Sequence, residues 1–117
     1  MPETREEVIF EVGSALHKRI RLTETQWQHI QKRQELRNQL DHMKETLSSP
    51  DAVYYVPHEA TYHYYRFYSR TPVGRKHMLV IVRHLNGEGF VITCFYARRI
   101  SKPEKVLLYE SLSQRPH

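Results

Sequence analysis

The hydrophobic period of this chain changes at Pro50, and the change restricts its possible folds more than any other sequence feature. Before Pro50, apolar residues recur mostly every three or four positions, which is typical of an amphipathic helix. After it the period is two, and segments rich in β-branched and aromatic residues alternate with turn signals. The segments are 52–56, 61–68, 77–85, 89–100 and 105–110. Asn86-Gly87 is the strongest hairpin signal, because both residues tolerate a positive φ. The short connections predict an antiparallel meander.

The part of the chain before Pro50 predicts a helical region at about 23–48. Thr23 and Gln26 have the spacing of a capping box, in which each side chain satisfies a backbone amide of the other residue. The apolar stripe that follows consists of Trp27, Ile30, Leu36, Leu40, Met43 and Leu47. No apolar residue falls within 31–35, so we expect a bend there or a break into two helices. Residues 8–12 and 18–23 alternate briefly and are compatible with a pair of short strands.

These patterns predict an α+β fold in which an N-terminal helical region packs on a four- to five-stranded antiparallel meander sheet. A chain of 117 residues suits a single domain spanning 1–117, with its core in about 20–110 and flexible termini. The residues that we expect in the core are Trp27, Ile30, Leu40, Leu47, Val80, Val82, Phe90 and Ile92.

Composition argues against several classes of protein. No apolar run approaches the ~20 residues that span a bilayer, so we expect no membrane partner. The lone cysteine, Cys94, excludes an internal disulfide and a multi-cysteine zinc site, and we expect it to be an inert packing residue. The first ten residues lack the pattern of a signal peptide. Together these features predict a cytoplasmic protein.

The charge is divided unevenly along the chain. Residues 1–60 contain 8 Lys and Arg against 10 Asp and Glu, a net −2, whereas residues 61–117 contain 10 against 3, a net +7. A basic half attracts polyanions, so nucleic acid becomes a candidate partner. Basic domains that bind no nucleic acid are also common, and charge alone leaves both options open.

The stretch YHYYRFYSR at 62–70 carries an unusual density of aromatic and cationic side chains. Strand alternation places Tyr62, Tyr64, Arg66 and Tyr68 on one side of the sheet. We expect this side to be an exposed platform and the side of Phe67 to be more core-like. Tyrosine and arginine on an open face can stack on bases and pair with phosphates, as in proteins that hold single-stranded nucleic acid. The alternative is that tyrosines simply form strands well.

The chemistry-bearing residues argue against a metal or a nucleotide cofactor. The eight histidines are scattered without metal-ligand spacing, and no glycine-rich phosphate loop is present. Metal-free cleavage of RNA requires a base, an acid and cations or hydroxyls around the phosphate. His29 is a candidate for proton transfer; its alternative is a capping or partly buried histidine.

Five segments together resemble one family. They are WQHI at 27–30, SSPDAVYY at 48–55, YYRFYSRTP at 64–72, HMLVIVRHL at 77–85 and GFVITCFYARR at 89–99. They are similar to small phage- and toxin-associated proteins of the barnase, EndoU, colicin and RelE-like (BECR) superfamily of metal-independent ribonucleases. The resemblance implies a helical part packed on a four-stranded antiparallel meander.

The resemblance also implies a cleft that brings together four residues, His29, Arg66, Arg83 and Thr93. Members often have His-Pro-Glu soon after the first histidine, whereas this chain has Gln34-Glu35. If the missing histidine is an acid or base in the family, this chain either uses Tyr65, Tyr96 or His84 instead or is inactive.

The resulting prediction is a metal-independent endoribonuclease that cleaves single-stranded or loop RNA by 2′-hydroxyl attack, as the toxin of a toxin–antitoxin pair. Its partners would be RNA and an antitoxin or inhibitor protein, with no cofactor and no metal. The predicted catalytic residues are His29, Arg66, Arg83, Thr93 and Tyr96. The predicted substrate-binding residues are Tyr64, Tyr65, His84 and Arg99. The alternative is a non-catalytic module for RNA binding or protein interaction on the same scaffold.

Overall fold

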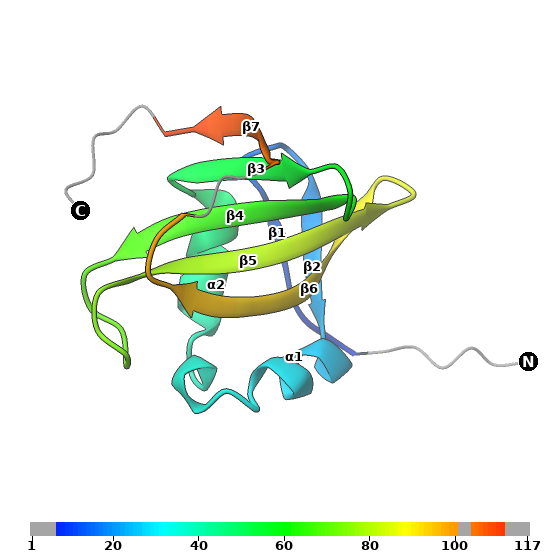
Figure 1. The fold of residues 1–117 in the computed structure, drawn as a ribbon. Coiled ribbons are helices and arrows are strands. Elements are labelled where there is room, and N and C mark those ends of the chain that lie inside the picture. Colours follow the sequence, from blue (N-terminus) through cyan, green and yellow to red (C-terminus); the bar gives the residue numbers. More distant parts are fainter. Residues whose placement is uncertain (1–6, 101–103, 112–117) are drawn as a thin grey trace, which may run out of the picture.

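The computed structural model describes residues 7–100 and 104–111, and within them the chain forms one mixed sheet with two short helices on one side (Figure 1). The strand order is β1-β2-β6-β5-β4-β3-β7. The strands are β1 (Val8–Gly13), β2 (Arg19–Thr23), β3 (Ala52–Val56), β4 (Thr61–Tyr68), β5 (Lys76–Leu85), β6 (Glu88–Ala97) and β7 (Val106–Glu110). The helices are α1 (Glu24–Ile30), the 3₁₀ turn η1 (Gln34–Leu36) and α2 (Leu40–Ser48). Neither helix in this part of the chain has the length and apolar character needed to cross a bilayer.

The predicted fold class is wrong. The sheet has seven strands instead of four or five, and it is mixed, because β2 runs parallel to β6 with Ile20 opposite Gly89. The hairpin of β1 and β2 extends the sheet instead of standing apart from it. Ile20 and Leu22 are fully buried, and joining the edge of β6 gives this short alternating strand a place to bury them.

The predicted helical region is broken into two short helices, which is one of the two alternatives that the sequence left open for 31–35. Thr23 caps α1 by accepting from the Gln26 amide at 3.4 Å, as expected. The Gln26 side chain, however, donates to the Ile92 carbonyl of β6 instead of reaching back to Thr23. The chain leaves the helix after Ile30, and Leu36 returns to the core from a 3₁₀ turn. A helix over 31–35 would have no apolar face to bury, which explains why the chain breaks there instead of bending.

The central part of the sheet follows the sequence pattern. Strands β3, β4, β5 and β6 pair in order as antiparallel neighbours. Asn86 and Gly87 both have positive φ, 54° and 83°, as a tight hairpin turn between β5 and β6 requires. The register of β5 and β6 shifts at Ile81/Val82, where Ile92 is the extra residue. Because of this bulge, Val91 and Cys94 enter the core, whereas Phe90 and Ile92 are only half-buried, contrary to prediction.

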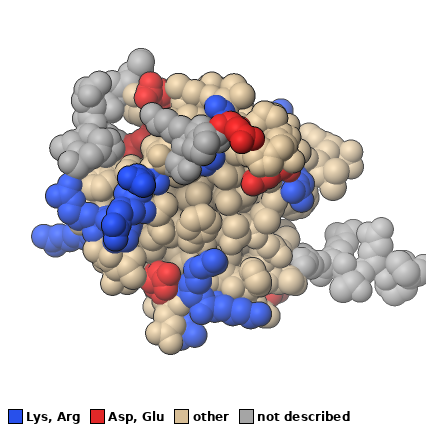
Figure 2. All heavy atoms as spheres, viewed as in Figure 1, with Lys and Arg blue, Asp and Glu red and all other residues tan. Residues whose placement is uncertain are grey.

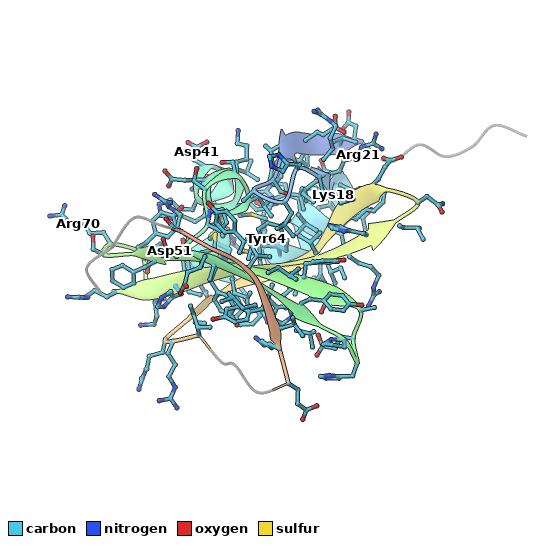
Figure 3. The ribbon with its side chains drawn as sticks, turned by 90° about the horizontal axis from the view of Figure 1, so that it is seen from above. Lys18, Arg21, Asp41, Asp51, Tyr64 and Arg70 are labelled. Carbon is cyan, nitrogen blue, oxygen red and sulfur yellow. The ribbon has the colours of Figure 1, made fainter. Side chains whose placement is uncertain are left out.

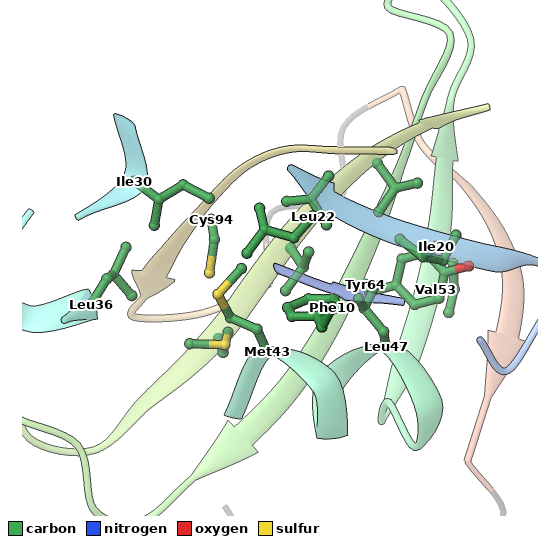
Figure 4. Packing of buried hydrophobic residues seen from close by; sticks show 14 residues of the cluster. Phe10, Ile20, Leu22, Ile30, Leu36, Met43, Leu47, Val53, Tyr64 and Cys94 are labelled. Atoms are coloured by element: carbon green, nitrogen blue, oxygen red, sulfur yellow. The ribbon is translucent and has the colours of Figure 1, made fainter. Parts of the chain in front are cut away.

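The main core lies between the sheet and the helices, and we call this side the helix face. Figure 3 shows α2 and β1 on the same side of the central strands β3–β6, and Figure 4 shows Tyr64 packed among apolar residues there. The most deeply buried members of this core are Ile20, Leu22, Ile30, Leu36, Met43, Leu47, Val53, Tyr64, Met78, Val80 and Val82. Cys94 belongs to the same cluster and is fully buried, and burial raises the pKa of its thiol, so it is a packing residue.

The opposite side of β3–β6 carries a smaller cluster of Ala52, Tyr54, Tyr65 and Leu79, and no described helix contributes to it. We call this side the open face. By strand alternation and register it also includes Thr61, His63, Phe67, His77, Ile81, Arg83, Thr93 and Phe95.

The predicted orientation of β4 is therefore inverted. Tyr62, Tyr64 and Tyr68 pack with the core of the helix face, whereas Tyr65 packs on the open face. The two sets are similarly aromatic, so alternation identified them correctly but could not show which of them the helices cover.

Candidate nucleic-acid interface on the open face

Three aromatic rings on or beside the open face each have a cation next to them. The Arg75 guanidinium carbon lies 5.4 Å from the centroid of Phe67, and that of Arg33 lies 5.6 Å from the centroid of Phe95. The Lys105 ammonium lies 5.1 Å from the centroid of Tyr65. The cations come from the β4–β5 turn, the segment between α1 and η1, and the residue before β7. Three distant parts of the chain thus place positive charge beside aromatic rings of one sheet face.

Most of the exposed cations gather at the margins of the open face. Figure 2 views the open face and shows Lys and Arg gathered at the left end of the sheet, where β4 and β6 end, and along the lower edge beside α1. Arg70, Arg75, Arg98 and Arg99 are exposed in the segments that follow β4 and β6. A ligand that spans the face would meet cations at its margins and, between them, aromatic surface crossed by a few polar groups.

A polar network crosses the open face next to Tyr65. Lys105 Nζ donates to the Tyr65 hydroxyl at 2.7 Å and lies 3.0 Å from His63 Nδ1. On the other side of the imidazole, Nε2 lies 3.3 Å from Thr61 Oγ1 and 3.5 Å from Glu59 Oε1. An ammonium can only donate, so His63 Nδ1 accepts and Nε2 carries the hydrogen. The order of the network is therefore Glu59, His63, Lys105 and Tyr65.

Burial sets the protonation of this network. Burial is the main cause that lowers the pKa of His63, and the charge of Lys105 lowers it further. Burial also lowers the pKa of Lys105, and Glu59 opposes this effect. The Thr61 hydroxyl is the main cause that lowers the pKa of Glu59. A neutral imidazole therefore separates a carboxylate from an ammonium.

Three predicted site residues lie on the open face. Tyr65 is only 1% exposed, and its hydroxyl accepts from Lys105. Its ring is therefore buried and is not accessible to a ligand. Arg83 is exposed and donates to the Glu59 carbonyl at 3.3 Å. Thr93 is half-buried and pairs with Ile81 across β5 and β6. Arg99, which follows β6, is exposed close in sequence to this face.

Tyr64 and Arg66 lie on the helix face instead. Tyr64 is fully buried and donates to Ser14 Oγ at 2.9 Å, and burial raises the pKa of its phenol to about 12. It has no exposed surface on which a base could stack. Arg66 donates to the Ser49 carbonyl and lies 3.4 Å from Glu45, at the end of α2. Arg66 thus joins β4 to the C-terminus of the helix, where backbone carbonyls attract a cation.

Tyr96 and His84 also lie on the helix face. The Tyr96 hydroxyl donates to Gln39 at 3.2 Å and lies 3.1 Å from His42 Nδ1, so it connects β6 to the start of α2. His84 stacks on Tyr62 with ring centroids 4.1 Å apart, and burial lowers its pKa. These contacts support structural roles for both residues.

His29 stands apart from the other predicted catalytic residues. Its side chain is exposed near the end of α1, and within the described residues no hydrogen bond or ion pair joins its imidazole to another group. The four residues of the implied cleft are therefore divided: Arg83 and Thr93 share the open face, Arg66 lies on the other side, and His29 lies on a helix at the edge of the sheet.

Sequence reasoning missed most of the residues that define the open face. His63 and Phe67 belonged to the set that we expected to be core-like, and Arg33 and Lys105 received no role. The cation–aromatic pairs join residues more than 35 positions apart in two cases, so no local pattern could reveal them. Within residues 7–100 and 104–111, no three or more His, Cys, Asp or Glu side chains gather as a metal site would require.

Comparison with protein-family models, curated proteins and solved structures gave no match to this chain. The resemblance to the BECR superfamily therefore stays a prediction that rests on the five sequence segments.

Proposed function

We propose that this protein binds single-stranded RNA on its open face. The observation that carries the proposal is the pair of half-buried rings with an arginine beside each, Phe95 with Arg33 and Phe67 with Arg75, next to the cation Lys105 that the Tyr65 hydroxyl holds. Single-stranded nucleic acid is held by aromatic rings that stack on bases and by cations that follow the phosphates. Phe67 and Phe95 are half-buried, so part of each ring remains accessible.

The test is fluorescence anisotropy with a labelled single-stranded RNA oligonucleotide of mixed sequence. Phe95→Ala should weaken binding by about 1–3 kcal/mol if the ring stacks on a base. Arg33→Gln and Arg75→Gln should each weaken it measurably. The matched control is Arg19→Gln, which removes the same charge from an exposed arginine of β2 that pairs with Glu11 at 3.1 Å. If Arg19→Gln and Arg33→Gln weakened RNA binding equally, the effect would come from net charge alone and would contradict a site on the open face.

Metal-independent RNA cleavage is the second candidate function. It is favoured by Arg83 and Thr93, which share the open face and could hold a phosphate and the charge that develops on it. In this reaction the RNA 2′-hydroxyl attacks the adjacent phosphorus, the 5′-oxygen leaves, and a 2′,3′-cyclic phosphate results. The histidine with the most complete network on this face, His63, is only 7% exposed, which favours binding without cleavage.

A cleavage assay separates the two candidates. Purified protein is incubated with RNA in excess EDTA, and the products are analysed for cyclic phosphate ends. Cyclic phosphate that is lost in Thr93→Val and Arg83→Gln would support the nuclease and its toxin role. Tight binding with intact RNA would support the non-catalytic module. A role for His29 in proton transfer is tested in the same assay by His29→Ala, which should lower the rate about 10²–10⁴-fold if the assignment is right.

A further inference from the structure

Lys105 is a half-buried cation with no carboxylate partner. Among residues 7–100 and 104–111, no Asp or Glu oxygen lies within ion-pair distance of its ammonium. Its two hydrogen-bond partners, the Tyr65 hydroxyl and His63 Nδ1, carry no formal charge when His63 is neutral. Glu59 acts on Lys105 from a distance and raises its pKa, but it forms no direct ion pair with it, and a partly desolvated cation without a direct ion pair is costly unless a ligand supplies one.

The network holds this charge in place without neutralising it. The nearest acid in the network, Glu59, contacts the far side of the imidazole, at 3.5 Å from His63 Nε2. The buried imidazole, 7% exposed, thus keeps the carboxylate away from Lys105. Two acceptors at 2.7 and 3.0 Å fix two of the three ammonium hydrogens. The third has no acceptor among the described residues.

We propose that Lys105 forms a phosphate-binding subsite of the open face and takes one non-bridging oxygen of an RNA phosphodiester. The inference rests on the proposed function and adds to it the group that the lysine recognises. The Tyr65 hydroxyl accepts from the ammonium at 2.7 Å, and the surrounding protein excludes part of the water. The exclusion of water strengthens the attraction between the ammonium and an anion relative to a fully solvated pair.

The alternative is that Lys105 only fastens the start of β7 to β4. That role predicts a loss of stability on substitution but no affinity for phosphate. The two roles are therefore distinguished in the wild-type protein by whether added phosphate changes the contact between Lys105 and His63 Nδ1.

The experiment uses the full chain labelled with ¹⁵N and follows the imidazole nitrogens of His63 by NMR. Inorganic phosphate is the probe, and sodium chloride at the same ionic strength is the control. We expect a saturable shift of His63 Nδ1 with phosphate but not with chloride, because a bound anion changes how the ammonium donates to that nitrogen. The shift should be absent in Lys105→Gln, which loses the charge but keeps an N–H donor.

RNA affinity is measured in parallel. Lys105→Gln should weaken RNA binding about tenfold or more, as expected for a hydrogen bond to a charged group. Lys18→Met is the matched control, because Lys18 is an exposed lysine on the other side of the sheet (Figure 3) and should leave affinity nearly unchanged.

The outcomes separate this inference from the proposed function. A wild-type protein without a saturable phosphate shift overturns the subsite, whatever its affinity for RNA. Unchanged RNA affinity in folded Lys105→Gln also overturns it, while RNA binding itself would stand. A phosphate shift that depends on Lys105 in a protein that binds no RNA supports the subsite and rejects the proposed function. If Lys105→Gln does not fold, the wild-type titration decides alone.

Discussion

Three histidines, His42, His63 and His84, are partly or largely buried against aromatic or polar neighbours, and burial is the main cause that lowers the pKa of each. The folded protein therefore binds fewer protons than the unfolded chain just below the ordinary histidine pKa of 6.5. By linkage, these histidines do not reduce the free energy of unfolding above pH 6.5. The free energy of unfolding falls as the pH drops from 6.5 toward their lowered pKa values in the folded state.

The first prediction is that the free energy of unfolding decreases as the pH falls from 7.5 to 5.5, with the largest contribution from His63, the most buried of the three histidines. Urea unfolding at several pH values measures it. His63→Gln should reduce this pH dependence, because burial lowers the pKa of His63. Identical slopes for the wild type and His63→Gln would show that His63 titrates alike in both states.

Arg66 provides the second prediction. Its side chain is only 12% exposed and joins β4 to Glu45 and the Ser49 carbonyl. Removing it leaves a helix-terminal carbonyl and a carboxylate without their cation, so Arg66→Ala should destabilise the fold by roughly 1.5–3 kcal/mol. Arg70→Ala, at an exposed position just after the same strand, should change stability by less than about 0.5 kcal/mol. Thermal unfolding compares the two variants, and RNA affinity in folded Arg66→Ala should stay near that of the wild type. A stable Arg66→Ala variant that no longer binds RNA would contradict this structural role and show that Arg66 contributes to RNA binding.

At the scale of elements, the sequence predicted those features that depend on residues close together in the chain. The Asn86-Gly87 turn, the cap at Thr23 and the order of β3 to β6 depend on residues near one another in sequence, and all are found. The parallel pairing of β2 with β6 joins residues about 69 positions apart, such as Ile20 and Gly89, and no local period encodes it.

The candidate site shows the same division. The residue types were informative, since Arg83, Thr93 and Tyr65 do share one face of the sheet. Which face the helices cover depends on tertiary contacts such as Tyr64 with Ser14, 50 positions earlier in the chain. Sequence alternation could therefore sort the side chains into two sets without showing which set is accessible.

Gly89 tests the contact between β2 and β6. A Cβ at this position would overlap Ile20 Cδ1 and approach the Arg19 carbonyl oxygen to 3.3 Å. The backbone oxygen cannot move without displacing β2, so Gly89→Ala should destabilise the protein by about 1–3 kcal/mol. Gly13→Ala is the matched control in β1, where a Cβ meets nothing within 4 Å, and should have little effect. Urea unfolding of both variants measures the difference, and equal stabilities would mean that β2 and β6 are not packed this closely.

At the scale of the whole molecule, the division of charge along the sequence only partly describes the surface. The second half of the chain carries the net +7, and Arg75, Lys105 and Arg83 on or beside the open face come from it. Arg33, however, comes from the half with a net −2 and reaches Phe95 from the segment after α1. Folding thus adds a cation from the acidic half to the margin of a face built by the basic half.

This assembly of charge leads to a prediction about salt. Four cations, Arg33, Arg75, Arg83 and Lys105, lie on or beside the open face, and three of them adjoin aromatic rings. If three or four of them contact phosphates, counterion release predicts that the logarithm of RNA affinity falls with the logarithm of salt concentration with a slope of roughly −2 to −3.

Anisotropy titrations from low to high sodium chloride measure this slope. Arg33→Gln should make it shallower by about 0.7, because one phosphate contact on a single strand is lost, while Arg19→Gln should leave it unchanged. Phe95→Ala should weaken binding at every salt concentration without changing the slope, because stacking releases no counterions. A slope near zero, or an equal change in slope for Arg19→Gln and Arg33→Gln, would contradict an electrostatic RNA site on this face.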